Sequence, residues 1–175
     1  MHSHILNLNK EKNPDYFSLI DRHDEIIQEW GEILERVHKF RIPEFRIRNF
    51  SIPDVTPFNA LKYKKELSVI GNDAIKLQTK FVRWNNDSMN FCASPKYVLS
   101  QDTDLDNALT MIHFNSFLLS LVERVNSDMV LLLSDYNLRY SEIENSANYW
   151  TAFTAWVLAF VGLVISLIGI FYALK

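Results

Sequence analysis

The apolar positions in the first quarter of the chain follow the spacing of an amphipathic helix. Ring and aliphatic side chains recur at alternating steps of four and three, which puts them on one helix face. The positions are Tyr16, Ile20, His23, Ile27, Trp30, Leu34 and Val37. Asn13 and Pro14 provide a capping residue and a proline at the first helical position, and Pro43 disfavours helical geometry just before it. The pattern predicts a helix over 14–41.

The same spacing in threes and fours predicts two more helices, over 57–85 and 105–149. Connectors that contain proline, at about 41–57 and 85–103, separate the three helices. The 4 glycines and 5 prolines of this 175-residue chain are too few for the many turns of a sheet. The predicted fold class is therefore all-α.

The third helix is expected to continue into a membrane. Between Leu105 and Gly162 no proline or glycine interrupts the pattern, although a bend near Ser146 is an alternative. Residues 150–174 carry no charge, and a bilayer core needs about 20 apolar residues in a row. Aromatic rings at both ends of this stretch are typical of lipid–water boundaries. We expect a cytoplasmic helical bundle over 1–149 that continues into a single C-terminal transmembrane helix over 150–174.

The two ends of the chain predict its orientation. The first residues lack the apolar core of a secretory signal, and only Lys175 follows the apolar stretch. Moving one residue across a bilayer is easier than moving a folded, charged domain, so we expect the N-terminus to stay in the cytoplasm. The single cysteine, Cys92, requires no oxidising compartment. The predicted location is the inner (cytoplasmic) membrane, crossed once.

A stripe of small residues runs along the predicted span. All its alanines and glycines, with its one serine, recur at alternating steps of three and four. The residues are Ala152, Ala155, Ala159, Gly162, Ser166, Gly169 and Ala173. Small residues let helix backbones approach closely in lipid, and a heptad period implies a left-handed crossing. The stripe predicts a homo-oligomer, because a single span needs its partner from another chain; chance alignment is the alternative.

The net charge of −3 hides an uneven distribution. Residues 1–35 carry 3 basic and 8 acidic side chains, residues 36–83 carry 11 and 4, and residues 84–149 carry 3 and 9. Such a basic belt can contact an anionic partner such as RNA or lipid headgroups. Its candidate contacts are Arg36, Lys39, Arg41, Arg46, Arg48, Lys62, Lys64 and Lys65. The alternative is that basic and acidic helices pair with each other, within or between subunits.

The sequence offers no recognisable catalytic motif. It contains no phosphate-binding glycine loop, no His-Glu-x-x-His motif, no nucleophile elbow and no cysteine pair for zinc. His23 lies on the apolar stripe of the first helix, where a hydrogen-bonded core role is the commoner one. We therefore expect no catalytic residues, no metal site and no cofactor.

The layout of a helical domain at 14–41, 57–85 and 105–149, followed by one span, resembles that of a known family. The family comprises the membrane accessory proteins of type VI-B CRISPR systems, which are RNA-guided and target RNA. The resemblance implies a divergent HEPN-like helical domain, a homo-oligomeric membrane pore that supports antiphage defence, and a functional link to an RNA-guided effector or RNA.

The histidines of this chain depart from the pattern of HEPN ribonucleases. Those enzymes carry an arginine, then four to six residues, then a histidine. This chain has Arg22-His23 and Arg36-Val-His38, and no arginine stands at the required spacing before any histidine. The resemblance therefore carries over the role in pore formation and no catalytic residues.

The leading hypothesis from the sequence is a homo-oligomeric pore in the lipid bilayer. The candidate groups at its cytoplasmic mouth are Asn145, Asn148, Thr151 and Thr154. Beyond them the wall is apolar, and such a constriction can gate by dewetting. The alternatives are a dimer or trimer whose span only anchors it, a non-conducting tail-anchored adaptor or tether that recruits a partner, and, ranked last, a membrane-bound ribonuclease.

Overall fold

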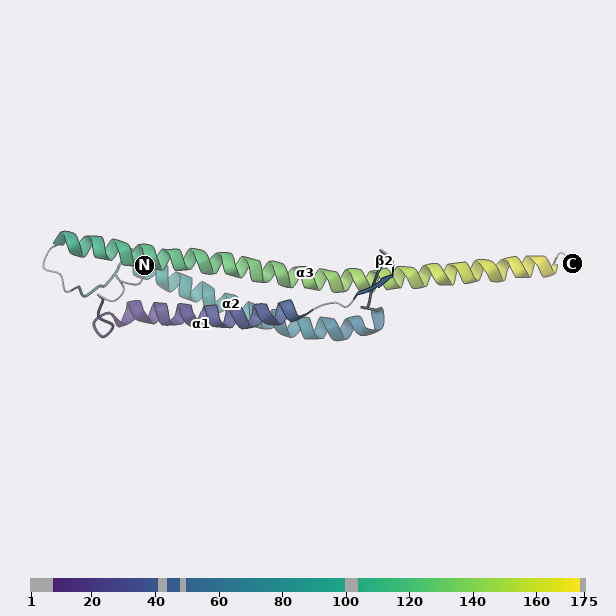
Figure 1. Cartoon of the computed structure of the whole chain (residues 1–175), viewed down its shortest axis with the longest axis horizontal. Coiled ribbons are helices and arrows are strands. Elements are labelled where there is room, and N and C mark those ends of the chain that lie inside the picture. Colours follow the sequence, from purple (N-terminus) through teal and green to yellow (C-terminus); the bar gives the residue numbers. More distant parts are fainter. Residues whose placement is uncertain (1–7, 41–43, 48–49, 100–103, 174–175) are drawn as a thin grey trace. The chain divides into compact units, whose positions relative to one another are not determined.

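A computed structural model describes residues 8–40, 44–47, 50–99 and 104–173. Its elements in chain order are α1 (Pro14–Lys39), β1 (Glu44–Ile47), β2 (Phe50–Pro53), α2 (Pro57–Ala93) and α3 (Asp104–Ala173). Figure 1 shows the three helices and the short hairpin, which follows α1 and precedes α2 in the chain. The all-α prediction is confirmed, since helices make up nearly all of the described chain.

The differences from the predicted elements are local. Helix α2 continues to Ala93, through residues 85–88, which the sequence pattern assigned to a connector. Helix α3 is unbroken over 70 residues and has no interruption at Ser146. The connector after α1 holds a two-stranded antiparallel hairpin, in which Glu44 pairs with Pro53 and Ile47 with Phe50.

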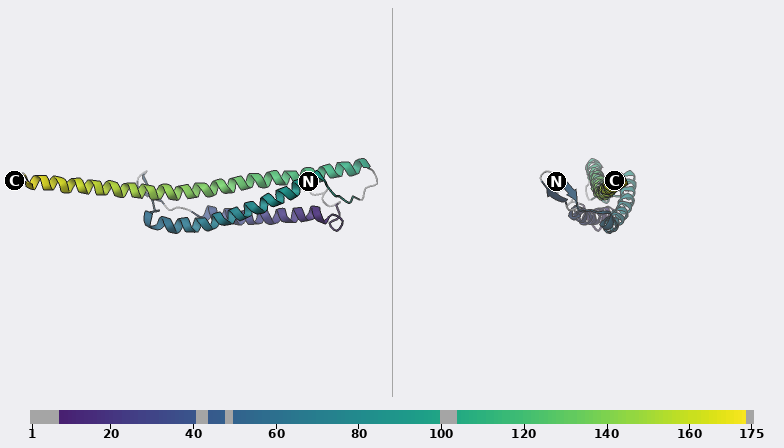
Figure 2. Two further views of the ribbon diagram at one scale, coloured as in Figure 1. Left: turned by 180° about the vertical axis from the view of Figure 1, so that it is seen from behind. Right: turned by 90° about the vertical axis from the view of Figure 1, so that its right-hand side faces the viewer.

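The chain divides into two units, and all three helices contribute to both. The first unit takes residues 1–36 and 70–134, and the second takes residues 37–69 and 135–175. Figure 2 shows the helices from two further directions, and in the first unit the segments of α1, α2 and α3 lie side by side.

The core of the first unit lies where its three helical segments meet. The predicted apolar stripe of α2 is confirmed from Ile70 to Trp84, and that of α3 from Leu118 to Leu132. Trp84 is fully buried, and its indole N–H donates a hydrogen bond of 2.8 Å to the Leu19 carbonyl. The indole N–H of Trp30 donates to the Asp128 carbonyl at 2.9 Å. The two tryptophans therefore tie α1 to both other helices.

The buried face of α1 is rotated slightly from the predicted one. The prediction placed Ile20, Ile27 and Leu34 inward, but each of these is only half-buried. The fully buried residues are their neighbours Leu19, Ile26 and Ile33, with Tyr16 and Val37 at the two ends as predicted. The stripe keeps its heptad period and is displaced by one residue at every other position.

The second unit contains the hairpin, the start of α2 and the C-terminal half of α3. Its small core includes Val37, Val55, Leu67 and Ile143, all essentially inaccessible to solvent. Beyond this core, every residue of α3 from 151 to 172 is exposed, and no other described part of the unit covers it (Figure 1). That bare segment makes up most of the predicted span, 150–174.

Candidate functional site

The apolar end of α3 is the first part of the candidate site. Within the described residues, α3 is the one helix long and apolar enough to cross a membrane, and none of its most apolar window is buried. Large exposed side chains such as Trp156, Leu163 and Ile165 would be costly in water over so many turns. A bilayer removes this cost, because its hydrocarbon core accepts about 20 apolar residues of helix.

The predicted stripe forms one open face of this helix. A methyl group added at Gly162 or Gly169 would meet no atom within 4 Å. Ala152, Ala155 and Ala159 are exposed in the same way. Ser166 lies on this face too, and Ala173 ends the helix, although its side chain lies outside the described residues. The face is therefore free for close approach by another helix.

The threonine and serine hydroxyl groups of the predicted span are satisfied by their own helix. Thr151, Thr154 and Ser166 each donate to the carbonyl four residues earlier, at 2.9, 2.8 and 2.8 Å. Back-bonding of this kind lets a hydroxyl enter an apolar environment without an unpaired donor. These groups impose little cost on insertion.

The stripe continues upstream of the span, which the sequence reasoning missed. Asn148, Asn145, Ser141 and Leu138 extend the same alternation of three and four, and all are exposed. Neither amide side chain has a hydrogen-bond partner in the described part of the chain. This continuation can be read from the sequence by counting steps of four and three back from Ala152. A single open face thus runs from the bundle into the span.

The four candidate groups of the pore mouth do not share this face. Asn145 and Asn148 lie on it, whereas Thr154 follows Ala152 by two residues and so points about 160° away. Thr151 flanks the face. If copies meet along the stripe, the two asparagines lie at their contact, Thr151 lies beside it and Thr154 lies away from it.

A ladder of ion pairs joins α1 to α2 in the first unit. Its three rungs are Arg22–Asp87 (2.7 Å), Glu29–Lys80 and Arg36–Asp73 (2.8 Å). Each step of seven along α1 matches a step of seven back along α2, as expected for antiparallel helices in heptad register. The sign alternates from rung to rung. Sliding one helix by a heptad would set Arg22 against Lys80 and Glu29 against Asp73, so the ladder disfavours that register.

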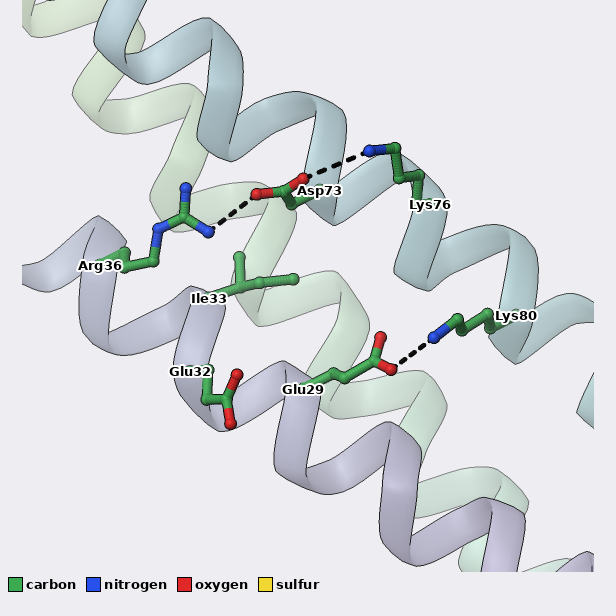
Figure 3. Close-up of a pocket in the computed structure, with 7 residues that line it drawn as sticks. All are labelled: Glu29, Glu32, Ile33, Arg36, Asp73, Lys76 and Lys80. Carbon is green, nitrogen blue, oxygen red and sulfur yellow. Dashed lines mark hydrogen bonds and ion pairs between the residues drawn. The ribbon is translucent and has the colours of Figure 1, made fainter.

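The groove between the Glu29–Lys80 and Arg36–Asp73 pairs has no net formal charge. Figure 3 shows its side chains, with Arg36 and Lys76 both directed at the Asp73 carboxylate, at 2.8 and 3.6 Å. Its cavity of about 240 Å³ is lined by three acidic and three basic residues with Ile33. The Arg36 guanidinium holds the pKa of Asp73 below its usual value. A groove without excess positive charge is poorly suited to an anion such as RNA.

The basic belt is partly engaged inside the chain. Arg36 is in the ladder, and Lys64 in the second unit lies 2.8 Å from Glu144 and 5.4 Å above the Tyr140 ring. The Glu144 carboxylate, through this hydrogen bond, raises the pKa of Lys64. Two of the predicted contact residues thus favour the internal-pairing alternative. Lys62 and Lys65 are exposed and form no ion pair among the described residues.

The other belt residues give less information. Lys39 is the last residue of α1. Its side chain is exposed and already takes part in an interaction with another group. Arg46 lies on β1, but its side chain is outside the described residues. Arg41 and Arg48 also fall outside them. The structure therefore leaves the surface formed by Lys62 and Lys65 as the part of the belt open to a partner.

The remaining candidate chemistry has structural roles. His23 Nδ1 lies 2.9 Å from the Asp24 carboxylate, and His38 Nε2 lies 2.8 Å from that of Asp135. Burial raises the pKa of the Cys92 thiol, which disfavours the reactive thiolate. No group of three or more potential metal ligands occurs in the described ranges. Comparison with protein-family models, curated proteins and solved structures finds no match.

Proposed function

We propose that the protein is a single-pass membrane protein that assembles through the small-residue face of α3 into a homo-oligomeric pore. The observation that carries this proposal is the open face itself. It is fully exposed along an apolar helix, and it has empty space at Gly162 and Gly169. Apolar bulk does not bring helices together in lipid, but small residues allow the backbone approach that does.

The asparagines support assembly beyond the span. Asn145 and Asn148 continue the face outside the bilayer, where their unpartnered amides are free to bond to a neighbouring copy. A polar residue at such a seam position is a known means of setting register and subunit number in coiled coils. The proposed seam therefore has a close-packed part in lipid and a hydrogen-bonded part at the mouth.

The proposed pore has a polar entrance and an apolar wall. Asn145 and Asn148 lie near the entrance, and beyond them the span offers chiefly aliphatic and aromatic side chains. A narrow apolar lumen conducts when it is wetted and closes when it dries. Permeabilising the membrane in this way is the role suggested by the resemblance to type VI-B accessory proteins, with antiphage defence as its setting and a functional link to an RNA-guided effector or RNA.

The proposed orientation places the helical units in the cytoplasm and the span in the inner membrane. Lys62, Lys64 and Lys65 belong to the same unit as the segment of α3 that enters the bilayer. Positive charge next to a span favours the cytoplasmic side. Protease added to intact cells should then leave the helical units uncut.

A non-conducting tether is the second candidate, and one observation favours it. The hydroxyls of Thr151, Thr154 and Ser166 are all bonded within their own helix, and residues 151–172 carry no charge. An assembly of such spans presents few polar groups to water. If it does not conduct, the protein holds its helical units at the membrane surface to recruit a partner.

Ion flux separates the two candidates. The full-length protein, reconstituted in liposomes loaded with potassium, should release the ion, and the rate should rise more steeply than linearly with protein density. Resistance to alkaline extraction, measured on the same liposomes, reports insertion independently. Normal insertion without flux at any density would overturn the pore and leave the tether.

A further inference from the structure

The first turns of α2 carry an unusually exposed apolar pair. Phe58 is 95% exposed and Leu61 is 76% exposed, although both lie in a regular helix. The opposite face of the same turns is buried through Ala60 and Leu67. The helix is therefore held in place by one face, while its other face presents a ring and an isobutyl group to solvent. Single exposed apolar residues are common, but an adjacent pair of this size invites a partner.

Two lysines share this exposed face. Phe58, Leu61, Lys62 and Lys65 fall at spacings of three and four, which places them together on one side of the helix. Both lysines are exposed and form no ion pair in the described part of the chain, although the exposed Glu66 lies one turn after Lys62 on the same side of the helix. An apolar tip next to unpaired lysines is the pattern of a surface that enters the boundary of an anionic bilayer.

The ion pair between α2 and α3 fixes where this face lies. Lys64 lies 2.8 Å from Glu144, and in the second unit α2 runs antiparallel to α3 (Figure 1). Six residues back from Lys64 is Phe58, and six residues on from Glu144 is Trp150. Helices rise by the same 1.5 Å or so per residue, so Phe58 is level with Trp150. Leu61 is level with residue 147 by the same count.

Trp150 marks the edge of the proposed span. Tyr149 and Trp150 are the aromatic rings at which the apolar helix begins, and such rings sit at the headgroup level. Phe58 then lies at this level too. Lys62 and Lys65 lie about 6 and 10 Å further from the hydrocarbon, within reach of lipid phosphates for a flexible lysine.

We propose that Phe58 and Leu61 insert into the bilayer boundary, while Lys62 and Lys65 bind the phosphates of anionic lipids. The inference rests on the proposed transmembrane placement of α3, and it adds a second membrane contact made by α2. With two contacts, the start of α2 is held against the membrane as well as against α3. Contact with lipid thus sets the orientation of the second unit at the membrane.

Spin labels on single cysteines measure this contact in the full-length protein. Cys92→Ala removes the one native cysteine, and a nitroxide is then placed at Phe58→Cys. The protein is reconstituted in phosphatidylcholine vesicles with and without phosphatidylglycerol. Oxygen dissolves in lipid and a nickel chelate stays in water, so their relative access reports depth. Phe58 is a safe site for substitution because its side chain contributes almost nothing to packing.

The matched control is Val69→Cys, on the same helix and 52% exposed. It lies 11 residues from Phe58, about 17 Å further from the membrane boundary. The label at Phe58 should be more accessible to oxygen and less accessible to nickel than the label at Val69. Lys62→Gln and Lys65→Gln should each lower the ratio of immersed to aqueous label about fivefold in phosphatidylglycerol vesicles, and little without that lipid.

A label at Leu163→Cys, inside the proposed span, separates failure of this inference from failure of the proposed function. Immersion at Leu163 with a fully aqueous label at Phe58 would overturn the α2 contact and leave the span intact. Aqueous labels at both sites would overturn both proposals. Exclusion of both oxygen and nickel at Phe58 would show that another protein surface covers it, and it would overturn the lipid contact.

Discussion

Two surfaces of this molecule repeat every seven residues, and they differ in the groups that contact them. Between α1 and α2, charges at steps of seven find opposite charges on the facing helix, with the three rungs led by Arg22, Glu29 and Arg36. Along the end of α3, small residues at steps of three and four meet nothing at all. The first surface is paired within one chain, and the second has no partner in the described part of the chain.

The comparison shows how side-chain chemistry assigns a helix face to its surroundings. Ion pairs work in water, where they add little stability but penalise a wrong register through like charges. Small residues contribute little to such an interface and much in lipid, where backbone proximity is the main attraction. Helix α3 takes part in a bundle over its first half and carries the small residues along its exposed apolar end.

The largest expected effect comes from filling the open face. Gly162→Leu with Gly169→Leu should abolish assembly and permeabilisation, because the added side chains force neighbouring backbones apart. Insertion should be unchanged, since leucine is more apolar than glycine. Oligomer size in detergent and membrane depolarisation in expressing cells are the readouts. Val164→Ala, on the opposite side of the helix, is the control and should leave both unchanged; normal assembly of the leucine variant would show that this face is not the seam.

A core substitution in the first unit should have the next largest effect, a loss of stability. Trp84→Ala removes a fully buried indole and its hydrogen bond to the Leu19 carbonyl. Such truncations cost about 3–5 kcal/mol in free energy of unfolding. Circular dichroism during denaturant unfolding measures the loss. Met89→Ala on the same helix is half-exposed and should stay within about 0.5 kcal/mol of the parent; an equal loss from both would contradict the described packing.

Charge reversal in the ion-pair ladder should change stability less, and reversal of the partner should restore it. Glu29→Lys places like charges at the middle rung and should cost about 1 kcal/mol or less, because both side chains of this rung are substantially exposed. Adding Lys80→Glu should recover most of that loss. Thermal unfolding of the parent, the two single variants and the double variant gives the coupling energy. Additive losses would show that Glu29 and Lys80 do not face each other.

The smallest effect concerns acid stability at the same ladder. Arg36 lowers the pKa of Asp73 in the folded state below the ordinary 3.8. The resulting stabilisation is full above the unfolded-state pKa and is lost as pH falls through the lower folded-state value. Stability should therefore decline more steeply below about pH 4 in the parent than in Asp73→Asn. Parallel acid titrations of the two would refute the interaction.

Much of the fold was predictable because its periodicity is strong. The buried stripe of α2 and the continuous α3 follow directly from steps of three and four. The face of α1 was less determined, since Leu19–Ile20, Ile26–Ile27 and Ile33–Leu34 each offer two adjacent apolar residues. Packing against the other two helices decides between them, and that information lies outside the local pattern.

The missed features depend on contacts between distant residues. Residues 85–88 are polar and resemble a loop, but Ser88 is buried and Asp87 pairs with Arg22, so tertiary contacts keep them helical. The ladder needs the register of α1 against α2, which no single helix reveals. The proposed membrane level of Phe58 likewise depends on the pair between Lys64 and Glu144. The stripe of small residues needed no such information and was visible in the sequence.

Disulfide cross-linking in the membrane tests most directly whether α3 meets other copies through its open face. In the Cys92→Ala background, a cysteine is placed either at Gly162, on the face, or at Val164, on the opposite side. We expect that mild oxidation of membranes yields covalent dimers from Gly162→Cys and far fewer from Val164→Cys. Equal cross-linking of the two, or cross-linking of Val164→Cys alone, would contradict it.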